Sequence, residues 1–184
     1  MKTPDSINRL LNQRKKNNRF RKLIVPEPEM VDFWSNDYLG LARNKDLQKS
    51  FLSYLNGLED NRLFGSTGSR LVSGNQQVFV ETEAMLAKHF MSDSALLFPS
   101  GYMANLAFFS SIPQRNDLVL YDSEIHASIK ASLRQCNAEI KSFRHNDLDD
   151  LKLKIKVRKS EVYVATESIF SISGDMAPLK DLAS

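Results

Sequence analysis

The chain has 184 residues, of which 42% are hydrophobic and 26% are charged. This is ordinary globular composition, and the length suits one domain with a sizeable buried core. The single cysteine, Cys136, excludes an internal disulfide framework, and we expect it to pack in the fold rather than act as a nucleophile. No stretch approaches the roughly 20 apolar residues of a membrane span, and no secretion signal opens the sequence. We therefore expect a cytoplasmic protein with no membrane partner.

Basic residues cluster near the start of the chain, although the net charge is only +3. The cluster consists of Arg14, Lys15, Lys16, Arg19, Arg21 and Lys22. A nucleic-acid surface is one interpretation of such a cluster. The favoured interpretation is a solvated helix end, because cations stabilise the C-terminal carbonyls of a helix predicted over 5–17. The rest of the chain has no matching basic stripe, so nucleic acid is not expected as a partner.

The first 60 residues predict short helices joined by irregular segments. Asp5 or Ser6 is placed to cap the first helix. Its expected apolar face consists of Ile7, Leu10 and Leu11. Two prolines, at 26 and 28, then stop regular structure; residues 30–34 alternate like a short strand, and a second helix is expected at about 45–55.

After a segment rich in Gly and Ser over 65–74, helices and strands alternate. Helices are predicted over 77–90, 102–111, 126–135 and 148–157, and strands over 95–98, 118–121, 139–143 and 161–166. The helix over 77–90 has Val78, Met85, Leu86 and Phe90 as candidates for its buried face. Short, nearly continuous apolar strands in repeated βα units predict an α/β fold with a mostly parallel sheet and helices on both faces.

The predicted organisation is an N-terminal helical and linker segment over 1–60 and the first part of a larger domain over 61–184. Another helix begins at Pro178-Leu179, just before the sequence stops, and no linker follows it. We therefore interpret the end as an interruption of that domain.

Candidate chemistry lies where the predicted strands end, because ligands of such folds collect at the carboxyl ends of the strands. Polar segments follow three of them, at 100–102, 122–126 and 166–171. Gly101 permits close backbone approach, and the free N–H groups of a new helix favour a phosphate. Together the three segments predict one pocket, although each alone is a weak signal, since strand-to-helix turns often contain Gly, Ser and Asp.

The Gly-rich segment over 65–74 is neither a dinucleotide fingerprint nor a P-loop. It lacks the Gly-Lys-Ser/Thr ending, and no clear strand precedes it. Its spacing predicts a flexible or a tightly folded loop, and contact with a ligand stays open.

In order along the chain, five segments resemble the α-oxoamine synthase family of pyridoxal-phosphate enzymes. They are residues 35–41 (SNDYLGL), 65–74 (GSTGSRLVSG), 100–105 (SGYMAN), 122–128 (DSEIHAS) and 167–179 (ESIFSISGDMAPL). The resemblance implies the aspartate-aminotransferase-type large domain (fold type I), pyridoxal 5'-phosphate as cofactor and a homodimer. It also implies the condensation of an amino acid with an acyl thioester such as an acyl-CoA, which releases carbon dioxide and the free thiol.

The resemblance also implies roles for individual residues. The implied cofactor-binding residues are Gly101, Tyr102, His126, Glu167 and Ser171, with the first two at the phosphate. The implied substrate-binding residues are Arg21 and Asn36, with Arg19 competing for the role of Arg21. His126 is the catalytic residue that the resemblance implies. Physical chemistry supports this role, because a flat imidazole stacks on a flat cofactor ring and can exchange a proton. Without the family, a histidine at a helix start would be interpreted as a cap. No metal site is predicted, and His89 and His145 are expected to be structural or solvated.

The sequence departs from the family pattern in places. Phe79 stands where a histidine is common, and Ser173 stands where aspartate is common. The lysine that binds the cofactor covalently and the carboxylate for its pyridine nitrogen are expected beyond residue 184. Lysines such as those at 130, 152, 154, 156 and 159 lie on predicted charged helical faces and lack the context of such an anchor. The 184 residues alone are therefore expected to be inactive.

Several functions stay open within this resemblance. The loop over 65–74 is most similar to that of the 8-amino-7-oxononanoate synthases of biotin biosynthesis, which favours L-alanine and pimeloyl-CoA as substrates. Serine palmitoyltransferases come second, and 2-amino-3-ketobutyrate ligases differ more in this loop. A non-catalytic partner subunit without the lysine, and a sugar- or nucleotide-binding α/β module, are the alternatives from other classes.

Overall fold

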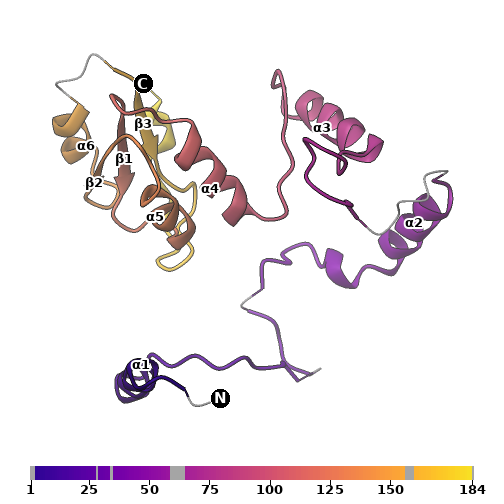
Figure 1. Ribbon diagram of the computed structural model, residues 1–184, viewed down its shortest axis with the longest axis horizontal. Helices are drawn as coiled ribbons and strands as arrows, with labels where there is room; N and C mark the ends of the chain where they lie inside the picture. Colours follow the sequence, from indigo (N-terminus) through magenta and orange to yellow (C-terminus); the bar gives the residue numbers. More distant parts are fainter. Residues whose placement is uncertain (1–2, 28, 34, 59–64, 156–159, 184) are drawn as a thin grey trace. The chain divides into compact units, whose positions relative to one another are not determined.

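The computed structural model describes residues 3–27, 29–33, 35–58, 65–155 and 160–183 (Figure 1). The chain divides into two compact units, Met1–Gly65 and Ser66–Ser184. Some sequence features lie outside the described residues: the proline at 28, position 34 of the predicted strand, the predicted helix end at 157, Lys156 and Lys159.

The described residues of the first unit form two helices and a 3₁₀ turn: α1 (Asp5–Lys16), η1 (Leu41–Arg43) and α2 (Lys45–Asn56). The side chain of Asn44 caps α2 by accepting the backbone N–H groups of Asp46 and Leu47. The N-cap of α1 is Pro4, and no side chain bonds there, so the predicted cap at Asp5 or Ser6 is wrong. Pro4, whose ring fixes its φ, stands at the start of this helix instead.

The predicted strand over 30–34 does not form in its described residues. Met30 and Phe33 lie in bends, Val31 and Asp32 have no regular structure, and the hydrogen bonds nearby are local. The N–H of Met30 donates to the carbonyl of Glu27, and the N–H of Ser35 donates to the Asp32 carboxylate. A strand needs a paired neighbour, and no described segment pairs here. The predicted apolar face of α1 is not buried either, since α1 has no buried residue.

The second unit is built on a parallel sheet. Its strands are β1 (Leu118–Asp122), β2 (Glu139–Phe143) and β3 (Val162–Ala165), and its helices are α3 (Gln77–His89), α4 (Gly101–Ser111), α5 (Ala127–Leu133), α6 (Leu148–Ile155) and α7 (Leu179–Leu182). The strand order is β2-β1-β3, with Leu118 paired to Glu139 on one side and to Val162 on the other. The predicted strands over 118–121, 139–143 and 161–166 are confirmed to within two residues.

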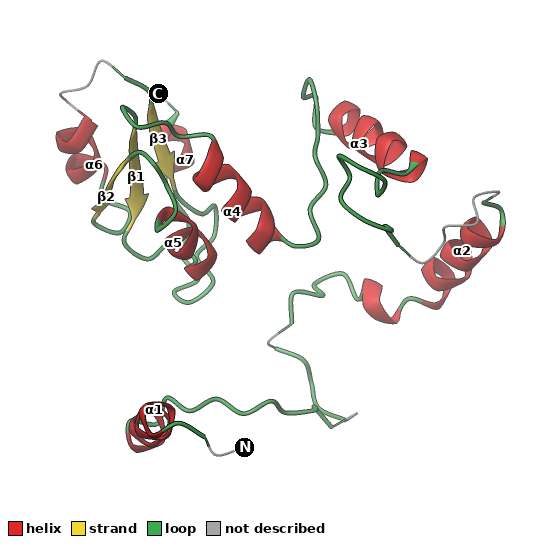
Figure 2. Cartoon of the chain, viewed as in Figure 1, coloured by secondary structure: helices red, strands yellow, loops and turns green. Residues whose placement is uncertain are grey.

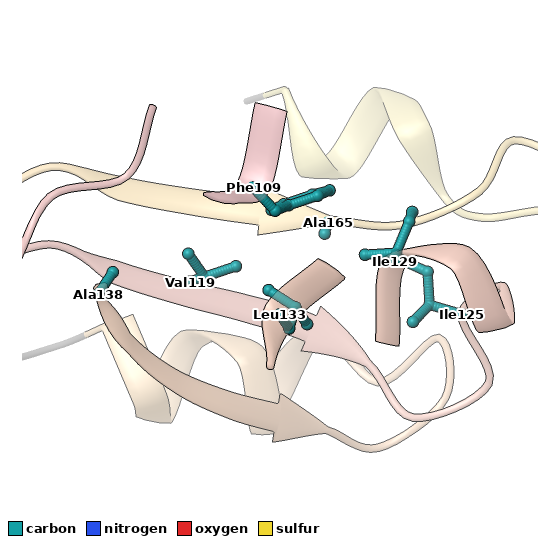
Figure 3. Close-up of a cluster of buried hydrophobic side chains, with 7 residues drawn as sticks. All are labelled: Phe109, Val119, Ile125, Ile129, Leu133, Ala138 and Ala165. Carbon is teal, nitrogen blue, oxygen red and sulfur yellow. The ribbon is translucent and has the colours of Figure 1, made fainter. Parts of the chain in front are cut away.

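Side chains of β1 alternate between two cores, one on each face of the sheet. Val119 packs with Phe109 of α4 and Ile129 of α5 (Figure 3). On the opposite face, Leu120 packs with Leu151 of α6. Helices therefore cover both faces, and the predicted α/β class is confirmed. Cys136 packs against the first of these cores, as predicted.

The predicted strand over 95–98 is absent, and Figure 2 draws the segment between α3 and α4 as loop. The reason is again a missing partner strand: the N–H of Leu97 donates to the Glu83 carboxylate at 2.7 Å instead of to a neighbouring strand. The predicted buried face of α3 is also partly wrong. Met85 and Phe90 are 62% and 69% exposed, and the buried residue of this helix is Ala87.

None of the helices among the described residues is long and apolar enough to cross a membrane.

Candidate active site

The strand order creates a switch point between β1 and β3. From β1 the chain passes through α5 on one face to β2, and from β2 it passes through α6 on the other face to β3. The segment that leaves β3 leads to α7, whose Leu182 packs against the core on the face opposite α5, so the segments that leave β1 and β3 diverge to opposite faces of the sheet. In open α/β sheets, ligands bind in the crevice at the carboxyl ends of two such strands.

The structure joins two predicted site residues across this switch point. His126 follows β1, Glu167 follows β3, and the backbone N–H of His126 donates to the Glu167 carboxylate. The contact spans 41 residues of sequence, so it depends on the parallel pairing of β1 with β3. The two loops that the sequence predicted to share a pocket thus meet.

His126 is the N-cap residue of α5, and contacts at the start of this helix hold its ring. Its Nδ1 accepts the backbone N–H of Ser128 at 3.2 Å and lies 2.8 Å from the Ser128 hydroxyl. The side-chain amide of Asn105, on α4, donates to the same hydroxyl at 2.8 Å. The local bond that favours a helix start therefore also orients the ring of this predicted site histidine.

The N-terminus of α4 offers backbone donors to an anion. The Ser100 hydroxyl caps the helix by accepting the N–H of Met103, while Gly101 and Tyr102 are exposed in its first turn. First-turn N–H groups have no partner within the helix itself. A Cβ built on Gly101 would meet no atom within 4 Å, so the space beside this backbone is open to a ligand. Gly101 lies one turn before Asn105, so both residues face the same side of α4.

A second histidine, which the sequence did not assign to the site, ties the strand ends together. Nδ1 of His145 is 2.8 Å from the carboxylate of Asp122, the last residue of β1, and Nε2 is 2.7 Å from that of Asp175. Asp122 is fully buried. Both carboxylates raise the pKa of His145, Asp122 most strongly, although partial burial acts against them. His145 is structural, as expected, but it fastens the loop that carries Ser171.

Neighbouring residues add further contacts to Asp175 and to the His145 ring. The Ser173 hydroxyl donates to Asp175, and this bond, followed by that to His145, lowers the pKa of Asp175. The side-chain amide of Asn146 also donates to Asp175, at 2.8 Å. Phe170 packs edge-on against the His145 ring at 4.5 Å. Ser173, the departure from the family pattern, is therefore part of the loop's own bonding.

The other predicted site residues are exposed. Ser171 lies in the turn between Phe170 and Gly174, which the N–H of Gly174 closes at 2.8 Å onto the Phe170 carbonyl. Arg21 and Asn36, the predicted substrate residues, belong to the first unit. Lys130 and Lys154 bond to the backbone carbonyls of Ser123 and Ser142.

The Gly-rich segment over 65–74 is tightly folded. A Cβ on Gly74 would lie 1.9 Å from the Gly68 carbonyl oxygen, so only glycine fits there. Arg70 forms a bidentate pair with Glu83 of α3, at 2.6 and 2.9 Å, and its guanidinium lies 5.0 Å from the Phe79 ring. The bond from Arg70, followed by that from Leu97, lowers the pKa of Glu83 to about 2. This carboxylate therefore links the Gly-rich loop to the segment that leads into α4.

Known proteins are similar to this chain in sequence and fold. The aminotransferase class I and II family profile matches residues 28–184. The 8-amino-7-oxononanoate synthase of Haemophilus ducreyi is 35% identical over 164 residues, covering 87% of this chain and 42% of the relative. A putative 8-amino-7-oxononanoate synthase of Haemophilus influenzae is 40% identical over 157 residues, covering 84% and 41%. The chain thus spans about two-fifths of the length of these relatives.

Solved structures of related proteins are also similar to this chain. A serine palmitoyltransferase from S. paucimobilis superimposes with a TM-score of 0.76 at 27% identity, over 97% of this chain and 49% of that one. An 8-amino-7-oxononanoate synthase from Francisella tularensis gives a TM-score of 0.68 at 29% identity, over 85% and 42%. The predicted resemblance and the fold type I assignment are confirmed. The chain belongs to the aminotransferase class I and II family of fold type I proteins.

Proposed function

We propose that the complete protein is a pyridoxal-phosphate-dependent acyltransferase that condenses an amino acid with an acyl thioester. It releases carbon dioxide and the free thiol and works in the cytoplasm as a homodimer. Residues 61–184 are then the first part of its cofactor-binding large domain, and residues 1–60 its N-terminal segment. The observation that carries the proposal is the bond from His126 to Glu167, which joins two predicted cofactor residues at the switch point.

The described residues suit this cofactor at both of its ends. The first-turn N–H groups of Gly101 and Tyr102 would bind the phosphate, since the positive end of a helix dipole favours a dianion. The His126 ring would cover the flat pyridine ring, with Glu167 and Ser171 beside it. When bound, pyridoxal phosphate supplies an electron sink for negative charge on the amino-acid carbon.

This chain's own residues supply orientation and proton handling. Ser128 and Asn105 hold the His126 ring, so the free nitrogen, Nε2, is the atom at which a proton can be held or moved. Glu167 holds the backbone of the same residue. Arg21 and Asn36 are proposed to bind substrate, with Arg19 the competing arginine.

We favour L-alanine and pimeloyl-CoA as substrates, because the curated relatives cited above carry the name 8-amino-7-oxononanoate synthase. Thiol release by the complete protein measures this directly. We expect the highest kcat/KM with pimeloyl-CoA and L-alanine. A higher kcat/KM with serine and palmitoyl-CoA, or with glycine and acetyl-CoA, would assign the protein to another branch of the family. The serine palmitoyltransferase superposition is the observation that supports that second candidate.

Replacement of His126 tests the catalytic assignment. In the complete protein, His126→Ala should weaken cofactor binding and slow turnover by about tenfold or more, the usual contribution of a positioned acid–base group. The matched control is His89→Ala, since His89 is exposed on α3. Unchanged kinetics in His126→Ala would reduce this residue to a helix cap, whereas loss of the folded state would make it structural.

A non-catalytic partner subunit is the alternative from another class. Borohydride reduction of the complete protein with its cofactor, followed by peptide mapping, separates the two. An enzyme should yield one stoichiometrically labelled lysine outside residues 1–184, and a scaffold should yield none. A labelled lysine within residues 1–184 would overturn our assignment of the anchor to later sequence.

A further inference from the structure

Three side chains from two helices and the loop before α5 form a chain of hydrogen bonds that ends on the site histidine. Asn105 on α4 bonds to the Ser128 hydroxyl, and that hydroxyl bonds to Nδ1 of His126, each at 2.8 Å. We infer that Asn105 and Ser128 are positioning residues that hold the His126 ring in the tautomer carrying its proton on Nε2. The catalytic meaning of this inference rests on the proposed function, but the tautomer itself does not.

The backbone N–H of Ser128 favours one direction for these hydrogen bonds. A hydroxyl can donate or accept, and a side-chain amide can be turned round, so those two contacts alone permit either tautomer. The N–H of Ser128 cannot be reversed, and it points at Nδ1 from 3.2 Å. A proton on Nδ1 would face this fixed donor, so the backbone favours Nδ1 as the acceptor and Nε2 as the nitrogen that carries the proton of the neutral ring.

The remaining bonds follow from that assignment. With Nδ1 as acceptor, the Ser128 O–H donates to it, which leaves the oxygen lone pairs of Ser128 for a donor. The Asn105 amide supplies that donor. Every group in the chain then has a complementary partner, whereas the opposite tautomer sets two donors against each other at Nδ1.

Burial makes the arrangement costly to change. Ser128 is 1% exposed and Ser132, whose hydroxyl donates to the Ser128 carbonyl at 2.6 Å, is fully buried. Water cannot readily replace a bond in such surroundings, so a mismatched donor would stay unsatisfied. The exposed part of this system is His126 itself, so the buried end sets the protonation pattern of the exposed end.

The inference is tested with histidine-selective ¹⁵N labelling of the complete protein, without cofactor or substrate, at a pH where the ring is neutral. The His126 signals are assigned by their absence from His126→Gln. We expect Nδ1 to give the signal of an unprotonated nitrogen and Nε2 that of a protonated one. The reverse pattern would overturn the inference, whether or not the proposed reaction is correct.

Asn105→Asp reverses the polarity of the chain with almost no change of shape. A carboxylate only accepts, so the Ser128 O–H should turn towards it, and the Nδ1 signal should move towards the protonated form. Turnover should fall about tenfold or more, since a misdirected tautomer removes most of the contribution of a positioned histidine. Ser111→Asp, which adds the same charge at an exposed position of α4, should change neither.

Ser128 provides the second arm, which holds even where Asn105→Asp fails to fold. Ser128→Ala removes the hydroxyl contact to Nδ1 and leaves the backbone N–H, so the Nδ1 signal should move part of the way towards that of a protonated nitrogen; Ser128→Thr, which retains the hydroxyl, should restore it. An unchanged signal in Ser128→Ala would show that the backbone N–H alone sets the tautomer, and the positioning role would be wrong.

Discussion

Replacement of Asp122 by alanine should destabilise the complete protein by about 3 kcal/mol. The carboxylate is fully buried at the end of β1 and accepts three hydrogen bonds: from the N–H of Glu124 at 2.8 Å, Nδ1 of His145 at 2.8 Å and the N–H of Asn146 at 2.9 Å. Its removal leaves all three donors without their acceptor. A buried donor left unsatisfied costs about 1–3 kcal/mol, and we take the lower figure for each because all three contacts are only part-buried.

Urea unfolding measures this effect, with the slope m checked to remain that of the wild type. The matched control is Asp149→Ala, because Asp149 is exposed on α6; its effect should stay within about 0.5 kcal/mol. A loss below about 1 kcal/mol for Asp122→Ala would refute the reasoning. It would mean that water reaches the strand end and replaces the carboxylate.

Three further predictions concern titration, the Gly-rich loop and the core. The pKa of His145 is raised above 6.5, so its stabilisation is complete below that pH and is lost as the pH rises through the folded-state pKa; urea midpoints should show this decline in the wild type and not in His145→Gln. The pKa of Glu83 is lowered from 4.5 to about 2, so its stabilisation is present above pH 4.5 and is lost as the pH falls towards 2. Glu83→Gln should therefore remove that acid dependence and speed amide hydrogen exchange at Leu97, whereas unchanged exchange would contradict the link. Leu120→Ala, at a fully buried position, should cost about 2–5 kcal/mol in urea unfolding, and Leu153→Ala, at an exposed one, under about 0.5 kcal/mol.

The sequence predicted the strands of the sheet where apolar or alternating runs lie between turn residues. The segments at 118–122 and 139–143 are short apolar or alternating runs between turn residues, and both became strands within one residue of the prediction. The segments at 95–98 and 30–34 look similar but did not. Strand formation depends on pairing with a neighbouring strand as well as on composition, and the sequence of a segment does not show whether such a neighbour is present.

The site was predictable to the extent that it follows strand ends. That rule, with the motif resemblance, selected the loops that carry His126 and Glu167, and the structure joins them. It was not applied to the segment after β2, where His145 and Asn146 lie. Applied there, it would have singled out this segment. The partners of His145 lie 23 and 30 residues away along the chain, so no local sequence pattern predicts them.

The bonding of His126 and His145 differs in a way that supports the role proposed for His126. Both nitrogens of His145 are committed to carboxylates, one at the end of β1 and one in the loop after β3. The His145 ring therefore has a structural role, because any ligand would first have to displace one of the two carboxylates. The contacts described for the ring of His126 are at Nδ1, and they come from a hydroxyl and a backbone N–H instead of carboxylates. Its second nitrogen can therefore bond to a ligand without breaking a bond that holds the fold together.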